Sequence, residues 1–171
     1  MDMRESTPVV IGAILAMLLQ IIIAPAIEIF SAMPNFITVY CLLVAVARPM
    51  SPVLPFVLGL INDVFVGTPI GSSSLALVVV CLVASRLFAA LNNDTVLIPL
   101  VILVVASFII ELIMGFFALS FGAAGDAGGM LLYRALPCGL YDCVVCLILY
   151  PLAMRVLVPQ APMGPGNPAH L

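Results

Sequence analysis

Residues 58–71 read Leu58-Gly59-Leu60-Ile61-Asn62-Asp63-Val64-Phe65-Val66-Gly67-Thr68-Pro69-Ile70-Gly71. This stretch places an amide and a carboxylate inside an apolar segment and follows them with a short turn rich in glycine and proline. A carboxylate in a membrane helix is costly, so Asp63 needs a structural or functional reason. The stretch therefore predicts two helices joined by a tight reversal, with Asp63 close to the turn.

The composition makes lipid the solvent for most side chains. The 171 residues are 65% hydrophobic and 8% charged, and the mean hydropathy is +1.36. A soluble domain of this length cannot bury so much apolar surface. The net charge is −3 and the chain has no lysine, so no basic patch is available for nucleic acid.

The hydropathy pattern predicts an all-α integral membrane protein with six transmembrane helices, over residues 8–30, 35–47, 52–66, 69–91, 96–121 and 130–158. The second and third are short, about 20–23 Å against a hydrocarbon core of roughly 30 Å, so a re-entrant pair is the alternative to two thin spans. Residues 1–7 are then a cytoplasmic N-terminus, 8–158 the transmembrane domain and 159–171 a disordered cytoplasmic tail.

The arginines predict the orientation of this bundle. With the N-terminus inside, Arg134 lies outside, and the other four lie on the cytoplasmic side: Arg4, Arg48, Arg86 and Arg155. Positive charge is enriched on the cytoplasmic side of membrane proteins. Six spans then place both termini in the cytoplasm.

Four carboxylates lie within the predicted helices: Glu28, Asp63, Glu111 and Asp142. Three of them have small side chains four residues away on both sides, in the sets Gly59–Asp63–Gly67, Ser107–Glu111–Gly115 and Cys138–Asp142–Cys146. Small residues let membrane helices approach closely, and a polar group at such a contact can bond across it. These three faces are therefore predicted to point into the bundle.

Two roles for these acids remain open, and both can hold together. As helix fasteners, Asp63 would accept hydrogen bonds from backbone N–H groups near residues 72–74, and Glu111 or Asp142 would pair with Arg134 or be protonated. As a functional site, the acids would line an outward-facing polar cavity that binds a small ligand or a partner segment.

Catalysis is poorly supported by the sequence. The only histidine, His170, lies in the predicted tail, and neither an HExxH nor a Ser-x-x-Lys motif is present. The sequence therefore predicts no enzyme activity, no catalytic residue, no metal site and no cofactor.

The run Gly59-Leu60-x-x-Asp63-x-x-x-Gly67-x-Pro69-x-Gly71-x-x-x-Leu75 resembles the signature of the rod shape-determining protein MreD family. Further features are similar over about residues 8–157, namely Leu18-Leu19-Gln20, Pro34-Asn35, Glu111 and Tyr150-Pro151. Glu111 departs from the family pattern, which usually has an aspartate there, and this puts the role of Glu111 in doubt.

The resemblance implies a multi-pass protein of the bacterial inner membrane, with no catalysis of its own, that acts as a scaffold in cell elongation. It implies an MreC-type partner and, through it, a link to MreB, RodA and a class-B penicillin-binding protein. It also implies an architecture like that of the S components of vitamin transporters; self-association is left open. The resemblance further implies a structural or partner-binding motif at the positions that match the family signature: Gly59, Asp63, Gly67, Pro69 and Gly71. The intramembrane polar cluster would comprise Glu28, Glu111, Arg134 and Asp142.

A vitamin-binding S component of an energy-coupling-factor transporter is the alternative function. The same architecture and the acidic cluster favour it. The absence of tryptophan and the small number of aromatic residues on the outer side argue against it, because solute pockets generally use them. Gly12-x-x-x-Ala16 would be a close-packing face for a transporter subunit or for the helix of a scaffold partner.

Overall fold

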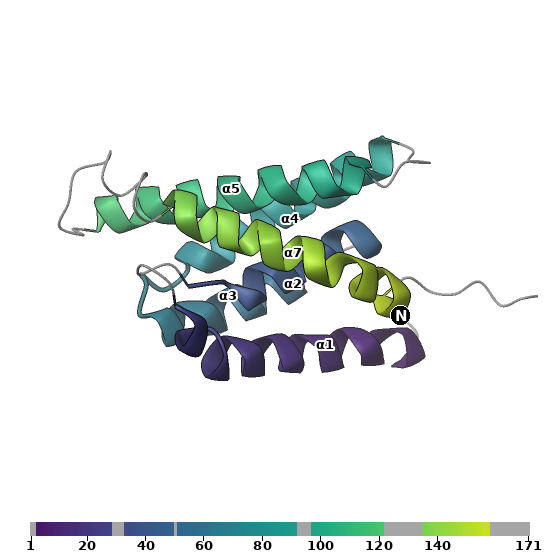
Figure 1. Cartoon of the computed structure of the whole chain (residues 1–171), viewed down its shortest axis with the longest axis horizontal. Coiled ribbons are helices and arrows are strands. Elements are labelled where there is room, and N and C mark those ends of the chain that lie inside the picture. Colours follow the sequence, from purple (N-terminus) through teal and green to yellow (C-terminus); the bar gives the residue numbers. More distant parts are fainter. Residues whose placement is uncertain (1–2, 29–32, 50, 92–96, 122–134, 158–171) are drawn as a thin grey trace, which may run out of the picture.

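The computed structural model describes residues 3–28, 33–49, 51–91, 97–121 and 135–157 (Figure 1). Within these ranges it contains six α-helices and one 3-10 turn. They are α1 (Met3–Ile22), η1 (Pro25–Ile27), α2 (Phe36–Ala47), α3 (Val53–Val66), α4 (Ser72–Ala90), α5 (Leu97–Ser120) and α7 (Leu136–Leu157). The predicted all-α class is confirmed.

Successive helices run in opposite directions, and α2 lies at the centre of the bundle (Figure 1). Between Phe36 and Val46 every side chain of α2 is buried except Tyr40, which is half-buried. Helices α1, α3, α4, α5 and α7 all contact α2. A helix that is apolar on every side is stable when protein or lipid surrounds it, and the other helices surround α2.

Among the described residues, three helices are long and apolar enough to cross a membrane: Ser72–Ala90, Ile98–Ser120 and Leu136–Leu157. The apolar part of α1 (Thr7–Ile22), α2 and α3 are shorter, so length and composition support three of the six predicted spans. Large apolar side chains are nevertheless exposed on both long and short helices, including Ile22, Val64 and Ile148. Such surfaces are typical of contact with lipid.

Three predicted helix boundaries are wrong. The first helix begins at Met3 rather than at residue 8, with Pro8 inside it. The first helix ends at Ile22 rather than at residue 30, because Pro25 has no N–H to donate to the preceding turn and the chain tightens into η1. The fourth helix begins at Ser72 rather than at Pro69, because Gly71 has a positive φ of 99° that a right-handed helix cannot contain. Residues 130–134 of the predicted sixth helix lie outside the described residues.

Candidate functional site

The turn between α3 and α4 has a glycine with positive φ at each end. Gly67 ends α3 with φ 71°, and its N–H donates to the carbonyl oxygen of Asp63 at 3.0 Å. Gly71 precedes α4 with φ 99°. Residues with a Cβ rarely adopt such values, so the spacing of these glycines fixes the turn.

Asp63 is buried beneath this turn and accepts four hydrogen bonds. Its Oδ1 accepts from Thr68 Oγ1 at 2.8 Å, from the Ser73 N–H at 3.0 Å and from Ser72 Oγ at 3.3 Å. Its Oδ2 accepts from the Gly71 N–H at 2.7 Å. These are the contacts expected of a fastener, since a carboxylate satisfies donors that a helix N-terminus leaves without intrahelical partners.

Gly59 lies where the backbones of α3 and α4 approach closely. A Cβ placed on Gly59 would lie 2.5 Å from Ser74 Cα and 2.7 Å from Ser74 N. Ser74 Oγ also donates to the carbonyl oxygen of Phe56 at 3.1 Å. Only glycine permits this approach of two backbones, and the approach brings the start of α4 within reach of Asp63.

A second group of polar side chains surrounds the N-terminus of α2. Asp142 Oδ1, from α7, accepts from the Asn35 N–H at 2.7 Å. Gln20 Oε1, from α1, accepts from the Phe36 N–H at 2.7 Å. Asn35 itself is the N-cap, and its Oδ1 accepts from the Thr38 N–H at 3.1 Å. Two other helices and the N-cap residue of α2 therefore each contribute a side-chain acceptor to the start of this buried helix.

The Gln20 contact was not predicted from sequence, although a glutamine in an apolar helix is a signal that a partner is needed. The Ser72 hydroxyl near Asp63 was likewise assigned only to a polar first turn. The backbone donor Ser73 N–H, in contrast, lies within the predicted residues 72–74.

Asp142 and Glu111 lie close enough for their carboxyl groups to interact electrostatically. Asp142 is fully buried, and its Oδ2 has no hydrogen-bond partner within the described residues. Only one of its two oxygens therefore contributes to capping α2.

Asp142→Asn is expected to change stability by less than about 1 kcal/mol, because an amide oxygen can still accept from the Asn35 N–H. Asp142→Leu is expected to cost about 2–4 kcal/mol, because it leaves that donor buried without an acceptor. Thermal melting of the detergent-solubilised variants measures both. Equal melting temperatures for the leucine and asparagine variants would show that the Asn35 bond contributes nothing.

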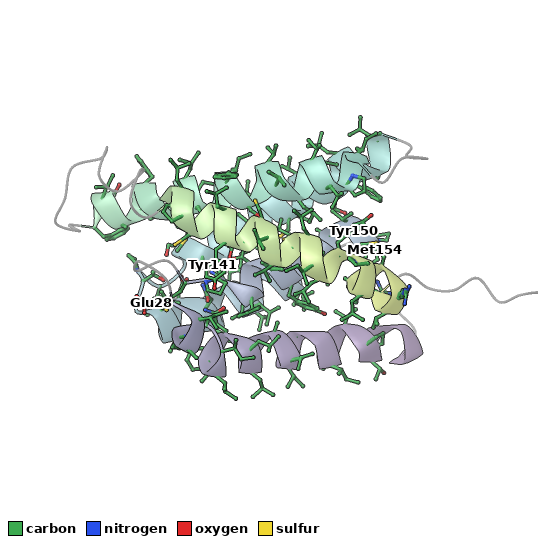
Figure 2. The ribbon with its side chains drawn as sticks, in the orientation of Figure 1. Glu28, Tyr141, Tyr150 and Met154 are labelled. Carbon is green, nitrogen blue, oxygen red and sulfur yellow. The ribbon has the colours of Figure 1, made fainter. Side chains whose placement is uncertain are left out.

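The predicted intramembrane cluster is brought together only in part. Glu111 and Asp142 are neighbours, whereas Glu28 is exposed at the residue that follows η1. Figure 2 shows Glu28 and Tyr141 toward one end of the bundle and Tyr150 toward the other. Tyr141 fastens this end, since its hydroxyl donates to the Ile27 carbonyl oxygen at 2.9 Å. Arg134 lies outside the described residues.

The three acid-bearing faces point inward for the most part. Gly59, Asp63, Ser107, Asp142 and Cys146 are buried, while Glu111, Gly115 and Cys138 are half-buried. Gly67 is the exception: it is exposed because it forms the turn rather than the helix.

The small-residue face of α1 packs within the chain. A Cβ on Gly12 would lie 2.7 Å from the ring of Tyr40, and Ala16 is buried. The Tyr40 hydroxyl donates to the Val9 carbonyl oxygen at 2.6 Å, which fixes the ring against α1. Gly12 therefore serves contact with α2, beside an apolar cavity of about 170 Å³ between α1, α2 and α7.

A cavity of about 120 Å³ with a mixed polar and apolar lining, which we call the end cavity, lies where α1, α3 and α5 end and α2 and α7 begin. Its polar lining comprises Gln20, Asn35, Asn62, Thr68 and Glu111. The end cavity thus connects the Asp63 turn to the polar group around α2. No cluster of three or more metal-ligating side chains is found within the described ranges.

Comparison with known proteins gives one match. The family model described as rod shape-determining protein MreD matches residues 3–158. No curated protein and no solved structure matches the chain.

Proposed function

Because the chain belongs to the rod shape-determining protein MreD family, we propose that it is a non-catalytic membrane scaffold of the bacterial cell-elongation machinery. In this role it binds an MreC-type partner and supports peptidoglycan synthesis. Through that partner it is linked to MreB, RodA and a class-B penicillin-binding protein. The observation that carries the proposal is the family match, which covers all the helices described above.

The use of the buried polar groups supports a scaffold rather than an enzyme. Asp63 makes four hydrogen bonds to the α3–α4 turn and the start of α4. Asp142 and Gln20 cap α2. Each contact joins elements of the chain, so these side chains have a structural purpose that requires no substrate.

We place the protein in the inner membrane with six spans and both termini in the cytoplasm. The apolar surfaces of the short helices support membrane contact along the whole bundle. Charge separation supports the orientation. By their positions along the helices, the four intramembrane acids Glu28, Asp63, Glu111 and Asp142 lie toward the end-cavity end of the bundle. Arg48, Arg86 and Arg155, near the C-terminal ends of α2, α4 and α7, lie toward the opposite end. The arginine end is then cytoplasmic.

The alternative of a vitamin-binding S component is not supported. Small-molecule sites usually enclose about 300–1,000 Å³, whereas the end cavity encloses about 120 Å³. A molecule of vitamin size does not fit into that volume without a rearrangement of the helices.

Affinity purification of the tagged chain from its native membrane in mild detergent, read by mass spectrometry, tests the proposal. We expect an MreC-type protein at close to one-to-one stoichiometry, with the synthase proteins in smaller amounts. A multi-pass protein of unrelated function with the same tag is the control. Recovery of transporter ATPases and a coupling subunit instead would overturn the scaffold assignment.

A further inference from the structure

The apolar cavity between α1, α2 and α7 is open along one side, and we call it the α1–α7 groove. Its lining side chains are hydrocarbon except for Tyr40, whose hydroxyl is already bonded to the backbone of α1. Its floor is closed, since Ala16 is 5% exposed and Leu43 is 3% exposed. Its walls are open, since Leu15 is 55% exposed and Leu152 is 60% exposed. In a membrane, the groove therefore faces lipid.

The dimensions of the α1–α7 groove fit one hydrocarbon chain. The lining follows α1 from Pro8 to Leu19, about 16 Å at 1.5 Å per residue, and one leaflet contributes about 15 Å to the hydrocarbon core. The enclosed volume of about 170 Å³ is close to the roughly 150 Å³ of a protein cavity that holds one benzene molecule. A partner helix, about 10–12 Å wide, does not enter such a volume. A segment of one acyl chain does, with the rest of the chain along the exposed walls.

Contact, rather than the hydrophobic effect, favours a chain in this groove. Lipid tails are as apolar as the leucines of the lining, so transfer from the bilayer gains no hydrophobic free energy. An empty groove, however, leaves the lining atoms without neighbours on one side and forfeits their dispersion attraction. A single flexible chain restores these contacts, because it follows a curved floor that the surface of a helix does not reach.

Positive charge at one end of the groove favours one kind of headgroup. Arg155 lies in the last turn of α7 and is exposed. It directly precedes Val156 and Leu157, which both line the groove. An arginine lays its apolar stem along the protein and places its guanidinium at the level of the headgroups, where its N–H donors match a phosphate. The arginine end of the groove therefore favours an anionic phospholipid.

We propose that the α1–α7 groove binds one anionic phospholipid, with an acyl chain in the groove and the phosphate on Arg155. The proposal goes beyond the scaffold function and requires only that the bundle lies in a membrane. With the arginine end in the cytoplasm, the lipid comes from the cytoplasmic leaflet, whose surface is negative.

Native mass spectrometry of the delipidated full chain in mild detergent tests the headgroup contact. The probes are dioleoyl phosphatidylglycerol and dioleoyl phosphatidylcholine at equal concentration, which share their acyl chains and differ in net charge. We expect phosphatidylglycerol to be preferred about fivefold as the first bound lipid, the effect of one basic residue near an anionic surface. Arg155→Gln is expected to lower this ratio to about one.

Arg86→Gln is the matched control for Arg155→Gln, because Arg86 is an exposed arginine of α4 near the same end of the bundle. We expect it to keep the preference. The charges at the start of the chain are the same in both variants, so they do not affect the comparison: Asp2, Arg4 and Glu5. No preference in the wild type, or an equal loss in the two variants, would overturn the proposal.

A second pair of variants tests the position of the acyl chain. Ala153→Leu fills the α1–α7 groove from α7, and Ala89→Leu makes the same change at an exposed position of α4. We expect binding of the first lipid to weaken at least fivefold in Ala153→Leu and to be unchanged in Ala89→Leu. Undiminished binding in a folded Ala153→Leu protein would overturn the proposal.

A double variant tests the walls without adding any atom, so that overpacking cannot unfold the chain. Leu15→Ala with Leu152→Ala lowers both walls, and Leu18→Ala with Leu147→Ala removes the same atoms from exposed positions outside the lining. We expect at least threefold weaker binding in the first double variant only. Equal losses in the two would contradict the groove.

Glycerol phosphate separates the lipid from its headgroup, because it carries the phosphate without acyl chains. We expect a large excess of it to leave phosphatidylglycerol bound to the wild-type chain. Displacement of the lipid would show a phosphate site that does not use the groove, and this would overturn the proposal.

Discussion

Asp63→Ala is expected to destabilise the protein by about 3–5 kcal/mol, enough to remove most folded protein from the membrane. The substitution leaves the N–H groups of Gly71 and Ser73 buried without an acceptor, and each such donor costs about 1–3 kcal/mol. It also removes the negative charge from the N-terminus of α4. Abundance in the membrane and melting after detergent extraction measure the effect.

Asp63→Asn separates the shape of the side chain from its charge. The amide keeps the three contacts of Oδ1 but turns its NH2 toward the Gly71 N–H, where the carboxylate has Oδ2. We expect an intermediate loss of about 1–2 kcal/mol. Glu28→Ala is the control, because this carboxylate is exposed at the same end of the bundle. Normal abundance of Asp63→Asn together with loss of cell shape would show that Asp63 does more than fasten helices.

Gly59→Ala is expected to lower the melting temperature by about 5–10 °C, equivalent to roughly 2–3 kcal/mol. The added methyl group would lie 2.5 Å from Ser74 Cα, and backbone atoms cannot move aside as the end of a side chain can. Separation of α3 and α4 would also lengthen the contacts between Asp63 and Ser73.

Gly115→Ala is the matched control for Gly59→Ala. Both substitutions replace a glycine within a helix, and both gain about 0.5–1 kcal/mol of helix propensity. Gly115 has open space where Gly59 has backbone, so the difference between the two variants isolates the close approach of α3 and α4. A Gly59→Ala protein that melts as high as Gly115→Ala would show that this approach is not needed.

The α3–α4 turn could be predicted closely from the sequence because its determinants are local. Gly67, Gly71 and Asp63 lie within nine residues of one another. The two glycines adopt the positive φ angles of the turn, and Asp63 accepts a hydrogen bond from a backbone N–H only eight residues away. The error at Pro69 has the same local origin: proline favours the first turn of a helix, but the left-handed Gly71 follows it and delays α4 to Ser72.

The polar group around α2 could not be predicted, because its members are distant in sequence. Asp142 and Asn35 are 107 residues apart, and helix periodicity gives the face of Asp142 but not the helix that it meets. The spacing of small residues indicated that Asp142 points inward. It did not indicate that Asp142 accepts a hydrogen bond from a backbone N–H, nor that the side chain of Glu28 is exposed.

The capping of α2 has a consequence for the order in which the protein is made. Asn35 is synthesised early, but its N–H donates to Asp142 in α7, the last of the described helices to leave the ribosome. Chains are made from the N-terminus at about 5–20 residues per second. The start of α2 therefore waits roughly 5–20 s in the nascent chain before its bond can form. Any truncation before α7 leaves the Asn35 N–H without this acceptor. We expect such a truncated chain to be a better substrate for quality-control proteases than the full chain.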